Sequence, residues 1–412
     1  MNNLTLKIDQ LVYGGRSIGR HNGKVVMISG AVLPGELVEV NVERDRRDYT
    51  EASVLKILES SADRIKPECK HFGICGGCNY QHIPYDLQVR LKEEIFKDCL
   101  KRFANTDIDL ADPIIGENQW HYRIRAQFKV AKDCLGFHKK GTRDIINIDS
   151  CPLMSRSINE FIYNSVDLFR NVRIKEIHIT GKSDLTAQVI ARRHSLLPAD
   201  AERLASDLID YGISGVKVKR GERDPMHFGQ TSITIDLGKF KFTVSPSSFV
   251  QSNWDLNQTV VDVIRNILQP LKGKKVLDLY AGSGNLSIPL AEEADVVAVE
   301  ENAHAIVDGN RNLEVNNIRN CEFINNSAEG FFSHDRFDIV IVNPPRPGLS
   351  NKVIENIFEF IPEKIIYVSC NPATFARDFK KLQSRYEAGS VRIVDFFPQT
   401  SHIESLACLT LR

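Results

Sequence analysis

The stretch K-V-L-D-L-Y-A-G-S-G-N (275–285) decides the fold of the C-terminal part of the chain. Its first half is apolar and predicts a buried strand, and its two glycines permit a sharp turn into a following helix. A dinucleotide-binding fold would use G-x-G-x-x-G here to seat a pyrophosphate, but Ser287 occupies the third position. Asp278 adds a carboxylate that would repel phosphate. The loop therefore favours a cationic ligand without phosphate, such as S-adenosylmethionine.

Outward from this loop, residues 246–412 alternate between strand and helix patterns. This alternation predicts an α/β domain with a doubly wound, Rossmann-like sheet. Glu300 ends the second strand, where it is placed to accept hydrogen bonds from both ribose hydroxyls of the cofactor. The expected strands are K-V-L-D-L-Y, V-V-A-V-E, C-E-F-I-N, F-D-I-V-I-V-N, I-I-Y-V-S-C, V-R-I-V-D-F and L-A-C-L-T-L.

Cys370 lies at the end of one of these strands, in K-I-I-Y-V-S-C-N-P (364–372). Open α/β sheets hold their ligands and reactive groups at the carboxyl ends of the strands. A single thiol at such a place is commonly a small packing residue. The glycine loop, Glu300 and a C-terminal acid, Glu404, favour a reactive thiol instead.

Length and charge limit the classes of function. With 412 residues the chain is too long for one core, so we expect two or three domains. The formal net charge is zero, so any contact with RNA must come from local patches. One basic patch spans residues 121–143, and its alternative interpretation is a solvated sheet face. It holds Arg123, Arg125, Lys129, Lys132, Lys139, Lys140 and Arg143 against a single acid, Asp133.

The chain shows no apolar run long enough to span a bilayer, and its N-terminus does not resemble a signal peptide. We therefore expect a cytoplasmic protein without a membrane partner. In that compartment the nine cysteines should serve as thiols, metal ligands or catalysts and not as disulfides. Nothing in the sequence indicates an obligate oligomer, and we expect a monomer.

Two further regions precede the α/β domain. Residues 1–58 show alternating apolar positions between the turn signals Gly14-Gly15, Asn22-Gly23 and Pro34-Gly35, which predicts an OB-like β-barrel that binds RNA or is purely structural. Residues 59–245 form a strand-rich central domain, interrupted by a stretch of helical spacing at 81–113.

The central domain contains a cluster of cysteines. Cys69, Cys75 and Cys78 lie in C-x5-C-G-G-C, and Cys151 in D-S-C-P-L is the natural fourth ligand. By ligand type, zinc and an iron–sulfur cluster are both compatible with this set. The five-residue spacing fits a zinc knuckle poorly and favours the cluster.

Together these motifs resemble the RNA uridine-5 methyltransferases, and specifically the 23S rRNA branch with an N-terminal TRAM domain and an iron–sulfur cluster. The resemblance covers almost the whole chain. G-G-R-S-I-G-R-H-N-G-K-V-V and A-V-L-P-G-E are similar to the TRAM signature, and S-P-S-S-F-V-Q-S-N (245–253) is similar to the family's F-x-Q-x-N segment. The series is completed by N-P-P-R-P-G (343–348), S-C-N-P-A-T-F-A-R-D (369–378) and F-P-Q-T-S-H-I-E-S (397–405).

The resemblance implies roles for particular residues. It makes Cys370 the nucleophile and Glu404 the base, and it assigns a [4Fe-4S] cluster to the four cysteines named above. It implies that the helical stretch 81–113 packs on the catalytic domain, which we place at 246–412. The expected RNA contacts are Phe249, Arg123, Arg125 and Arg346. The expected cofactor-binding residues are Gln251, Asp278, Tyr280, Gly282, Gly284, Asn285, Glu300, Ser327 and Asn343.

Two positions depart from the family pattern. Asn343 stands where the family usually has an Asp that helps to hold the target base, and Asn still offers a donor and an acceptor to uracil. Ser327 stands where an Asp or Asn of the family often binds the adenine amine, so this position departs from the residue types that usually make the contact.

The implied reaction is methylation of carbon 5 of a uridine that has been flipped out of its stack. A thiolate adds to carbon 6, carbon 5 takes the methyl group from S-adenosylmethionine, and a base removes the carbon 5 proton. We expect 23S rRNA as the substrate. The alternatives are the same chemistry on the T-loop uridine of tRNA, and a non-catalytic RNA-binding or assembly factor on this fold.

Overall fold

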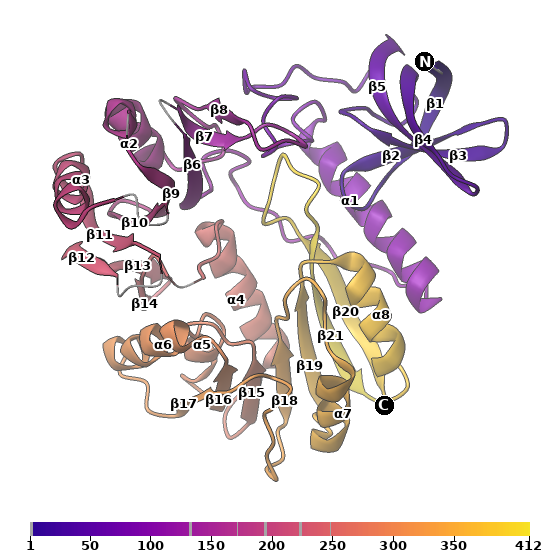
Figure 1. Ribbon diagram of the computed structural model, residues 1–412. Coiled ribbons are helices and arrows are strands. Elements are labelled where there is room, and N and C mark those ends of the chain that lie inside the picture. The colour runs from indigo at the N-terminus through magenta and orange to yellow at the C-terminus, as the bar shows by residue number, and fades with distance from the viewer. Residues whose placement is uncertain (1–2, 132–133, 171, 193–195, 222–224, 248) are drawn as a thin grey trace.

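The computed structural model describes residues 3–131, 134–170, 172–192, 196–221, 225–247 and 249–412. Over these residues the chain forms a closed barrel, a central seven-stranded sheet, a two-stranded hairpin and a second seven-stranded sheet (Figure 1). None of the described helices is both long and apolar enough to cross a membrane.

The N-terminal barrel closes in the order β1-β2-β3-β5-β4. Alternate apolar residues such as Ile8, Ile28 and Val38 point inward and are fully buried. Asn22 and Gly23 both have positive φ, as a tight turn between two antiparallel strands requires. The predicted OB-like barrel is thus confirmed. Its strands are β1 (Asn3–Val12), β2 (Arg16–His21), β3 (Lys24–Ser29), β4 (Leu37–Asp45) and β5 (Tyr49–Glu59).

The central sheet has the order β12-β11-β10-β9-β6-β7-β8. Helices α2 (Arg156–Ser165) and α3 (Pro198–Asp210) pack on one face, where Ile162 and Leu204 join the apolar residues of the strands. On the other face Lys217 donates to Ser247 over 2.8 Å and so holds the segment that leads to the next domain. The strands are β6 (Arg125–Ala131), β7 (Cys134–His138), β8 (Ile145–Asn147), β9 (Ile174–Gly181), β10 (Leu185–Ala191), β11 (Ile213–Lys219) and β12 (Met226–Gly229), and a 3-10 turn, η2 (Val166–Phe169), follows α2.

The C-terminal sheet has the order β17-β16-β15-β18-β19-β21-β20. The first five strands are parallel, and β21 and β20 are antiparallel to their neighbours. All seven expected strands are present, and the strand order reverses between β15 and β18, where such sheets bind ligands. The strands are β15 (Lys275–Leu279), β16 (Asp295–Glu300), β17 (Cys321–Asn325), β18 (Ile339–Val342), β19 (Lys364–Ser369), β20 (Tyr386–Val394) and β21 (Glu404–Leu411).

Five helices accompany this sheet, namely α4 (Trp254–Leu268), α5 (Ser287–Leu290), α6 (Ala303–Val315), α7 (Asn351–Phe360) and α8 (Pro372–Leu382). The hairpin of β13 (Ile233–Leu237) and β14 (Phe240–Val244) shares its apolar core with α4. The expected boundary at residue 245 assigns this hairpin to the central domain. Its apolar side chains are instead buried in the core of the C-terminal domain.

One helix from the first half of the chain also packs on the C-terminal sheet. Helix α1 (Tyr85–Cys99) continues into a π-helical turn, η1 (Leu100–Ala104), and runs beside α8 and β20 (Figure 1). Phe96 of α1 stacks on Phe375 of α8 with ring centroids 5.6 Å apart. The C-terminal sheet is thus covered on this side by a helical segment that precedes the central sheet in the sequence.

Candidate active site

A cleft of about 870 Å³ opens at the carboxyl ends of the parallel strands. Its walls come from the loops after β15, β16, β17, β18 and β19, from the start of β21 and from the segment before α4. The predicted residues that line it are Phe249, Gln251, Tyr280, Gly282, Glu300, Asn343, Arg346, Cys370 and Glu404. Both predicted catalytic side chains thus share one cleft with the glycine loop.

The glycine loop is held by the strand beside it. The Gly282 amide donates to Glu300 Oε2 over 2.9 Å, and the other Glu300 oxygen accepts from the Asn302 amide at 2.8 Å. Gly284 has a φ of 90°, and a Cβ there would lie 2.8 Å from Ile288 Cδ1. The second glycine is therefore needed for packing, while the first faces the cleft.

Four of the predicted cofactor residues do not line the cleft. Asp278 is buried under the loop, where its Oδ2 accepts from Ser287 Oγ at 2.5 Å. Asn285 exchanges two hydrogen bonds with Asn257, at 2.7 and 2.9 Å. Gly284 and Ser327 also lie outside the lining, although the neighbours of Ser327 on both sides belong to it. Direct cofactor contact by these four residues stays a prediction.

Cys370 is presented by a strand, a turn and a helix. Asn371 caps α8 by accepting from the Ala373 amide at 3.1 Å, and the Asn371 amide donates to Ser369 Oγ over 3.1 Å. Residue 370 is therefore held between the last residue of β19 and the helix cap, with its thiol half-buried at the cleft.

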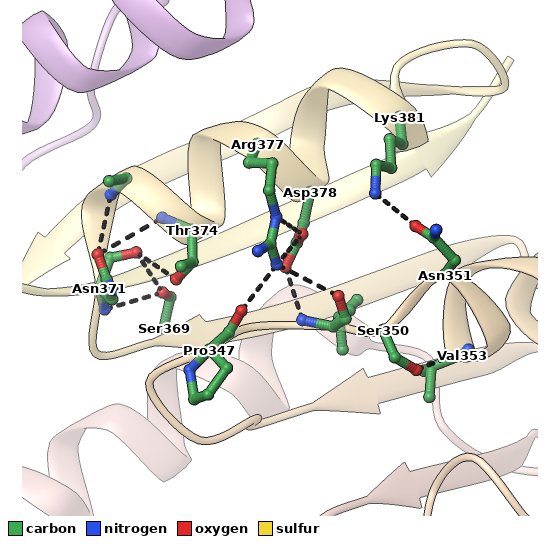
Figure 2. Close-up of polar contacts among 12 residues, drawn as sticks. Pro347, Ser350, Asn351, Val353, Ser369, Asn371, Thr374, Arg377, Asp378 and Lys381 are labelled. Atoms are coloured by element: carbon green, nitrogen blue, oxygen red, sulfur yellow. Dashed lines mark hydrogen bonds and ion pairs between the residues drawn. The ribbon is translucent and has the colours of Figure 1, made fainter.

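The N-P-P-R-P-G loop (343–348) is fastened to α8 by an Arg–Asp pair (Figure 2). Arg377 Nη2 donates to the Pro347 carbonyl at 2.7 Å and pairs with the buried carboxylate of Asp378 at 2.6 Å. Asp378 also accepts from the Leu349 amide at 2.7 Å. Farther along, Asn371 Nδ2 donates to the Arg346 carbonyl at 3.1 Å. The loop that carries Asn343 and Arg346 is thus tied to the helix that follows Cys370.

Burial sets the electrostatics of the two catalytic candidates. Burial, and after it the nearby carboxylate of Asp395, raise the pKa of Glu404 to about 8 against the opposing charge of Arg346. Burial and the Glu404 charge also raise the pKa of Cys370, again against Arg346. Glu404 is therefore mostly protonated at neutral pH, and Arg346 is the cation that favours the charged form of both groups.

The predicted RNA-contact arginines of the basic patch lie elsewhere. Arg123 is in van der Waals range of the Phe397 ring, with its guanidinium carbon 5.5 Å from the ring centroid, and it lines the cavity of the cysteines. Arg125 shares a smaller hollow with Phe249, whose ring is 67% exposed. Neither arginine lines the cleft, so their contact with RNA stays a prediction. Lys132 and Asp133 of that patch, and Ser248 of the F-x-Q-x-N segment, lie outside the described residues.

All four clustered cysteines line one cavity of about 120 Å³. Burial raises the pKa of Cys75, of Cys78 to about 12, and of Cys151, and neighbouring thiols of the set contribute to each shift. Among the described residues, no group of three or more His, Cys, Asp or Glu side chains is arranged to hold a single metal ion. The four thiols therefore surround a shared space without converging on one point.

Sequence reasoning missed several residues of the cleft. Glu301, Asn326 and Glu329 come from the loops after β16 and β17. The order of the parallel strands was the available signal, since the ends of neighbouring strands meet at one edge. Arg377 also lines the cleft, and it lies in the quoted motif around Cys370.

Comparison with known proteins agrees with this geometry. The model of the tRNA (uracil-5-)-methyltransferase family matches residues 84–412, and that of the TRAM domain matches residues 3–55. An uncharacterized RNA methyltransferase of Aquifex aeolicus is 34% identical over 99% of both chains. The 23S rRNA (uracil(1939)-C(5))-methyltransferase RlmD of Shewanella amazonensis is 31% identical over 99% of this chain and 96% of the relative.

Among solved structures, the tRNA (uracil-54, C5)-methyltransferase of Pyrococcus abyssi, in complex with S-adenosyl-L-homocysteine, superposes with a TM-score of 0.78. It is 27% identical and is matched over 99% of this chain and 100% of that chain. The family resemblance inferred from the motifs is confirmed by these matches. The chain belongs to the tRNA (uracil-5-)-methyltransferase family and carries an N-terminal TRAM domain.

Proposed function

We propose that the protein transfers the methyl group of S-adenosylmethionine to carbon 5 of a uridine in RNA. The observation that carries this proposal is the presence of Cys370, Glu404 and the glycine loop around one cleft. Its support from outside the chain is the family match and the names of the RlmD relatives.

The proposed reaction starts with the thiolate of Cys370. Its sulfur adds to carbon 6 of the uracil, and the electron pair of the carbon 5–carbon 6 double bond moves into an enolate. Carbon 5 then attacks the methyl carbon of the sulfonium, and the donor leaves as the neutral thioether S-adenosylhomocysteine. Carbon 5 now bears both a hydrogen and the new methyl group. The ring cannot regain its double bond until that hydrogen leaves as a proton.

Glu404 is the base in this proposal. Its carboxylate takes the carbon 5 proton, the electron pair re-forms the carbon 5–carbon 6 double bond, and the Cys370 thiolate is expelled. A carboxylate with a pKa of about 8 is a far better proton acceptor than an exposed one. The same burial leaves Glu404 mostly protonated at pH 7, so proton removal should accelerate as pH rises toward 8.

We propose that three further residues of the cleft hold the target uracil. Arg346 is exposed, beside Cys370 and Glu404, and its charge stabilises the thiolate. Asn343 is half-buried in the same loop and offers uracil one donor and one acceptor. The exposed ring of Phe249 at the mouth of the cleft is suited to stack on a base.

We propose 23S rRNA as the substrate, because RlmD relatives align over nearly the full length of this chain, TRAM domain included. The alternative is the T-loop uridine of tRNA, and the similarity to the Pyrococcus abyssi enzyme favours it. A non-catalytic RNA-binding factor on this fold is the third candidate.

Trapping distinguishes these candidates. RNA that contains 5-fluorouridine has no proton to lose at carbon 5, so the protein–RNA adduct should persist after methyl transfer. Unmodified 23S rRNA and tRNA transcripts would compete for the protein, and sequencing of the trapped RNA would identify the uridine. Cys370→Ala should abolish the adduct, and Cys134→Ala, which removes a half-buried thiol outside the cleft, should not. An adduct through another residue would refute the assignment of Cys370, and no adduct with either RNA would favour the non-catalytic factor.

We also propose a [4Fe-4S] cluster on Cys69, Cys75, Cys78 and Cys151. The support for it is that all four thiols line one cavity, since a cluster of this kind takes four cysteine ligands. Bound there, it would supply a covalent link between residues 69–78 and residue 151, and no step of the methylation needs it. Anaerobically purified protein should hold about four irons per chain and absorb visible light, and Cys78→Ser should lose both while Cys134→Ser keeps them. One equivalent of zinc and no iron would refute the cluster.

A further inference from the structure

The segment that leads into the base is held from outside its own domain. Residues 395–403, here called the base segment, join β20 to β21 and end next to Glu404. Residues from the first half of the chain form hydrogen bonds with its backbone and side chains. Tyr122 donates to the Pro398 carbonyl at 3.0 Å, and Asn79 pairs with Ser401 through bonds of 2.7 Å in both directions.

The strongest of these contacts is an ion pair with α1. Lys92 Nζ lies 2.7 Å from Asp395 Oδ1, and the two side chains are 1% and 0% exposed. The same ammonium donates to the Phe397 carbonyl at 3.2 Å. Asp395 directly follows Val394, which is the register partner of Glu404 in the β20–β21 ladder. The ion pair therefore lies beside the residue that carries the base.

A second contact comes from the same face of α1. Gln88 Nε2 donates to Gln399 Oε1 at 2.9 Å, and the Gln399 amide donates to Gln88 Oε1 at 2.9 Å. Gln88 and Lys92 are one helical turn apart and so project from one side of the helix. Gln399 has a φ of 67°, a conformation that a non-glycine residue keeps only when its surroundings hold it.

A buried ion pair is poor evidence for stability alone, because an apolar pair of the same volume usually stabilises a core as well or better. The second carboxylate oxygen of Asp395 faces the buried Tyr85 hydroxyl, so the ion pair belongs to a buried polar cluster and not to an apolar core. Such an arrangement needs another explanation than packing.

We propose that Lys92 and Asp395 are positioning residues for the base: the pair fixes the base segment and places one neutralised carboxylate beside Glu404. This inference rests on the proposed function of Glu404. The charged and titratable groups that face Glu404 are Asp395 after β20, Arg346 after β18 and Cys370 after β19, and α1 contributes Lys92 through Asp395. The Asp395 charge already raises the pKa of Glu404, and the Lys92 ammonium lies 2.7 Å from that carboxylate.

The test measures removal of the carbon 5 proton as tritium released from RNA that carries 5-tritiated uridine, across pH 6 to 9.5. Asp395→Asn removes the negative charge beside Glu404, so the midpoint of the rising limb should move to lower pH. Lys92→Met leaves Asp395 without its cation, so the midpoint should move to higher pH. A displacement of one pH unit changes tritium release about tenfold below the midpoint. Loss of folding cannot move the midpoint to lower pH in Asp395→Asn and to higher pH in Lys92→Met.

The double variant Lys92→Met with Asp395→Asn keeps the experiment informative if a single variant unfolds, because it buries no unpaired charge. Its midpoint should lie between those of the two single variants, because it removes both charges of the pair. Arg102→Met is the matched control, since it breaks an exposed pair with Asp98 near the end of the same helical segment and should leave the profile unchanged. Coincident profiles for wild type and all variants would overturn the inference and leave the proposed function intact. A wild-type protein that releases no tritium would instead refute the proposed function.

Discussion

Two buried carboxylic acids, one beneath the glycine loop and one lining the cleft, differ in what surrounds them. Asp278 lies beneath the glycine loop, with Ser287 donating to it, and burial raises its pKa to about 7. Glu404 lines the cleft and has a pKa raised by burial to about 8. No hydrogen bond to its carboxyl is found among the described residues. The Asp278 carboxyl is thus engaged by a side chain beneath the loop, whereas the Glu404 carboxyl lines the cleft, as the proposed proton transfer requires.

The largest expected effect is a difference in activity between variants of these two acids. Glu404→Gln should lower tritium release by about 10²–10⁴-fold, because the amide cannot accept the carbon 5 proton. The methylated Cys370–RNA adduct should then accumulate on denaturing gels. Asp278→Asn is the matched control and should retain tritium release within about tenfold at saturating methyl donor, since hydrogen bonding beneath the loop can be kept by an amide. Equal losses in the two variants would contradict the division of roles.

The second effect concerns stability as a function of pH. Both carboxyl groups have a folded-state pKa above the unfolded value, so the folded protein binds more protons and loses stability as pH rises from about 4 to about 8. Glu404→Gln should therefore be more stable than wild type at pH 8, by up to about 4 kcal/mol, and close to wild type at pH 4.5. Urea unfolding at the two pH values measures this difference. A variant less stable than wild type at pH 8 would show that Glu404 has a stabilising partner.

The glycine-loop end of the cleft was largely predictable from sequence, and the base end only in part. Strand, loop and helix around Gly282 follow from local chemistry, since few residues other than glycine tolerate positive φ. Cys370 was indicated by its place at the end of a strand, and the roles of Cys370 and Glu404 came from the motifs of the family. The contacts of Lys92 and Gln88 with the base segment join positions about 300 residues apart in the sequence. No local pattern carries such a pairing, and the helical spacing of α1 predicts only that one face is buried.

The third effect is a difference between the two glycines of the loop in the stability and ligand binding of their alanine variants. Gly284→Ala combines a φ of 90° with a Cβ 2.8 Å from Ile288 Cδ1, so we expect a loss of about 2–4 kcal/mol in unfolding free energy. Gly282→Ala has a φ of 59° and open space around the Cβ, so about 1–2 kcal/mol is expected. Binding of S-adenosylhomocysteine, measured by calorimetry, should weaken more in Gly282→Ala, because that residue lines the cleft. The reverse order in stability would contradict the packing role of Gly284.

The smallest effect tests whether Ser287 stabilises the charged form of Asp278. Ser287 donates a hydrogen bond that favours the charged carboxylate, and it thereby opposes the effect of burial. Ser287→Ala should lower the unfolding free energy by about 1–2 kcal/mol at pH 8, where Asp278 is ionised, and by less at pH 5.5, where it is protonated. Combining Ser287→Ala with Asp278→Asn should remove this dependence on pH, because no charge is left to stabilise. An equal loss at both pH values would mean that the hydroxyl fills space under the loop and does not stabilise the carboxylate, and the contrast with Glu404 would then rest on exposure to the cleft alone.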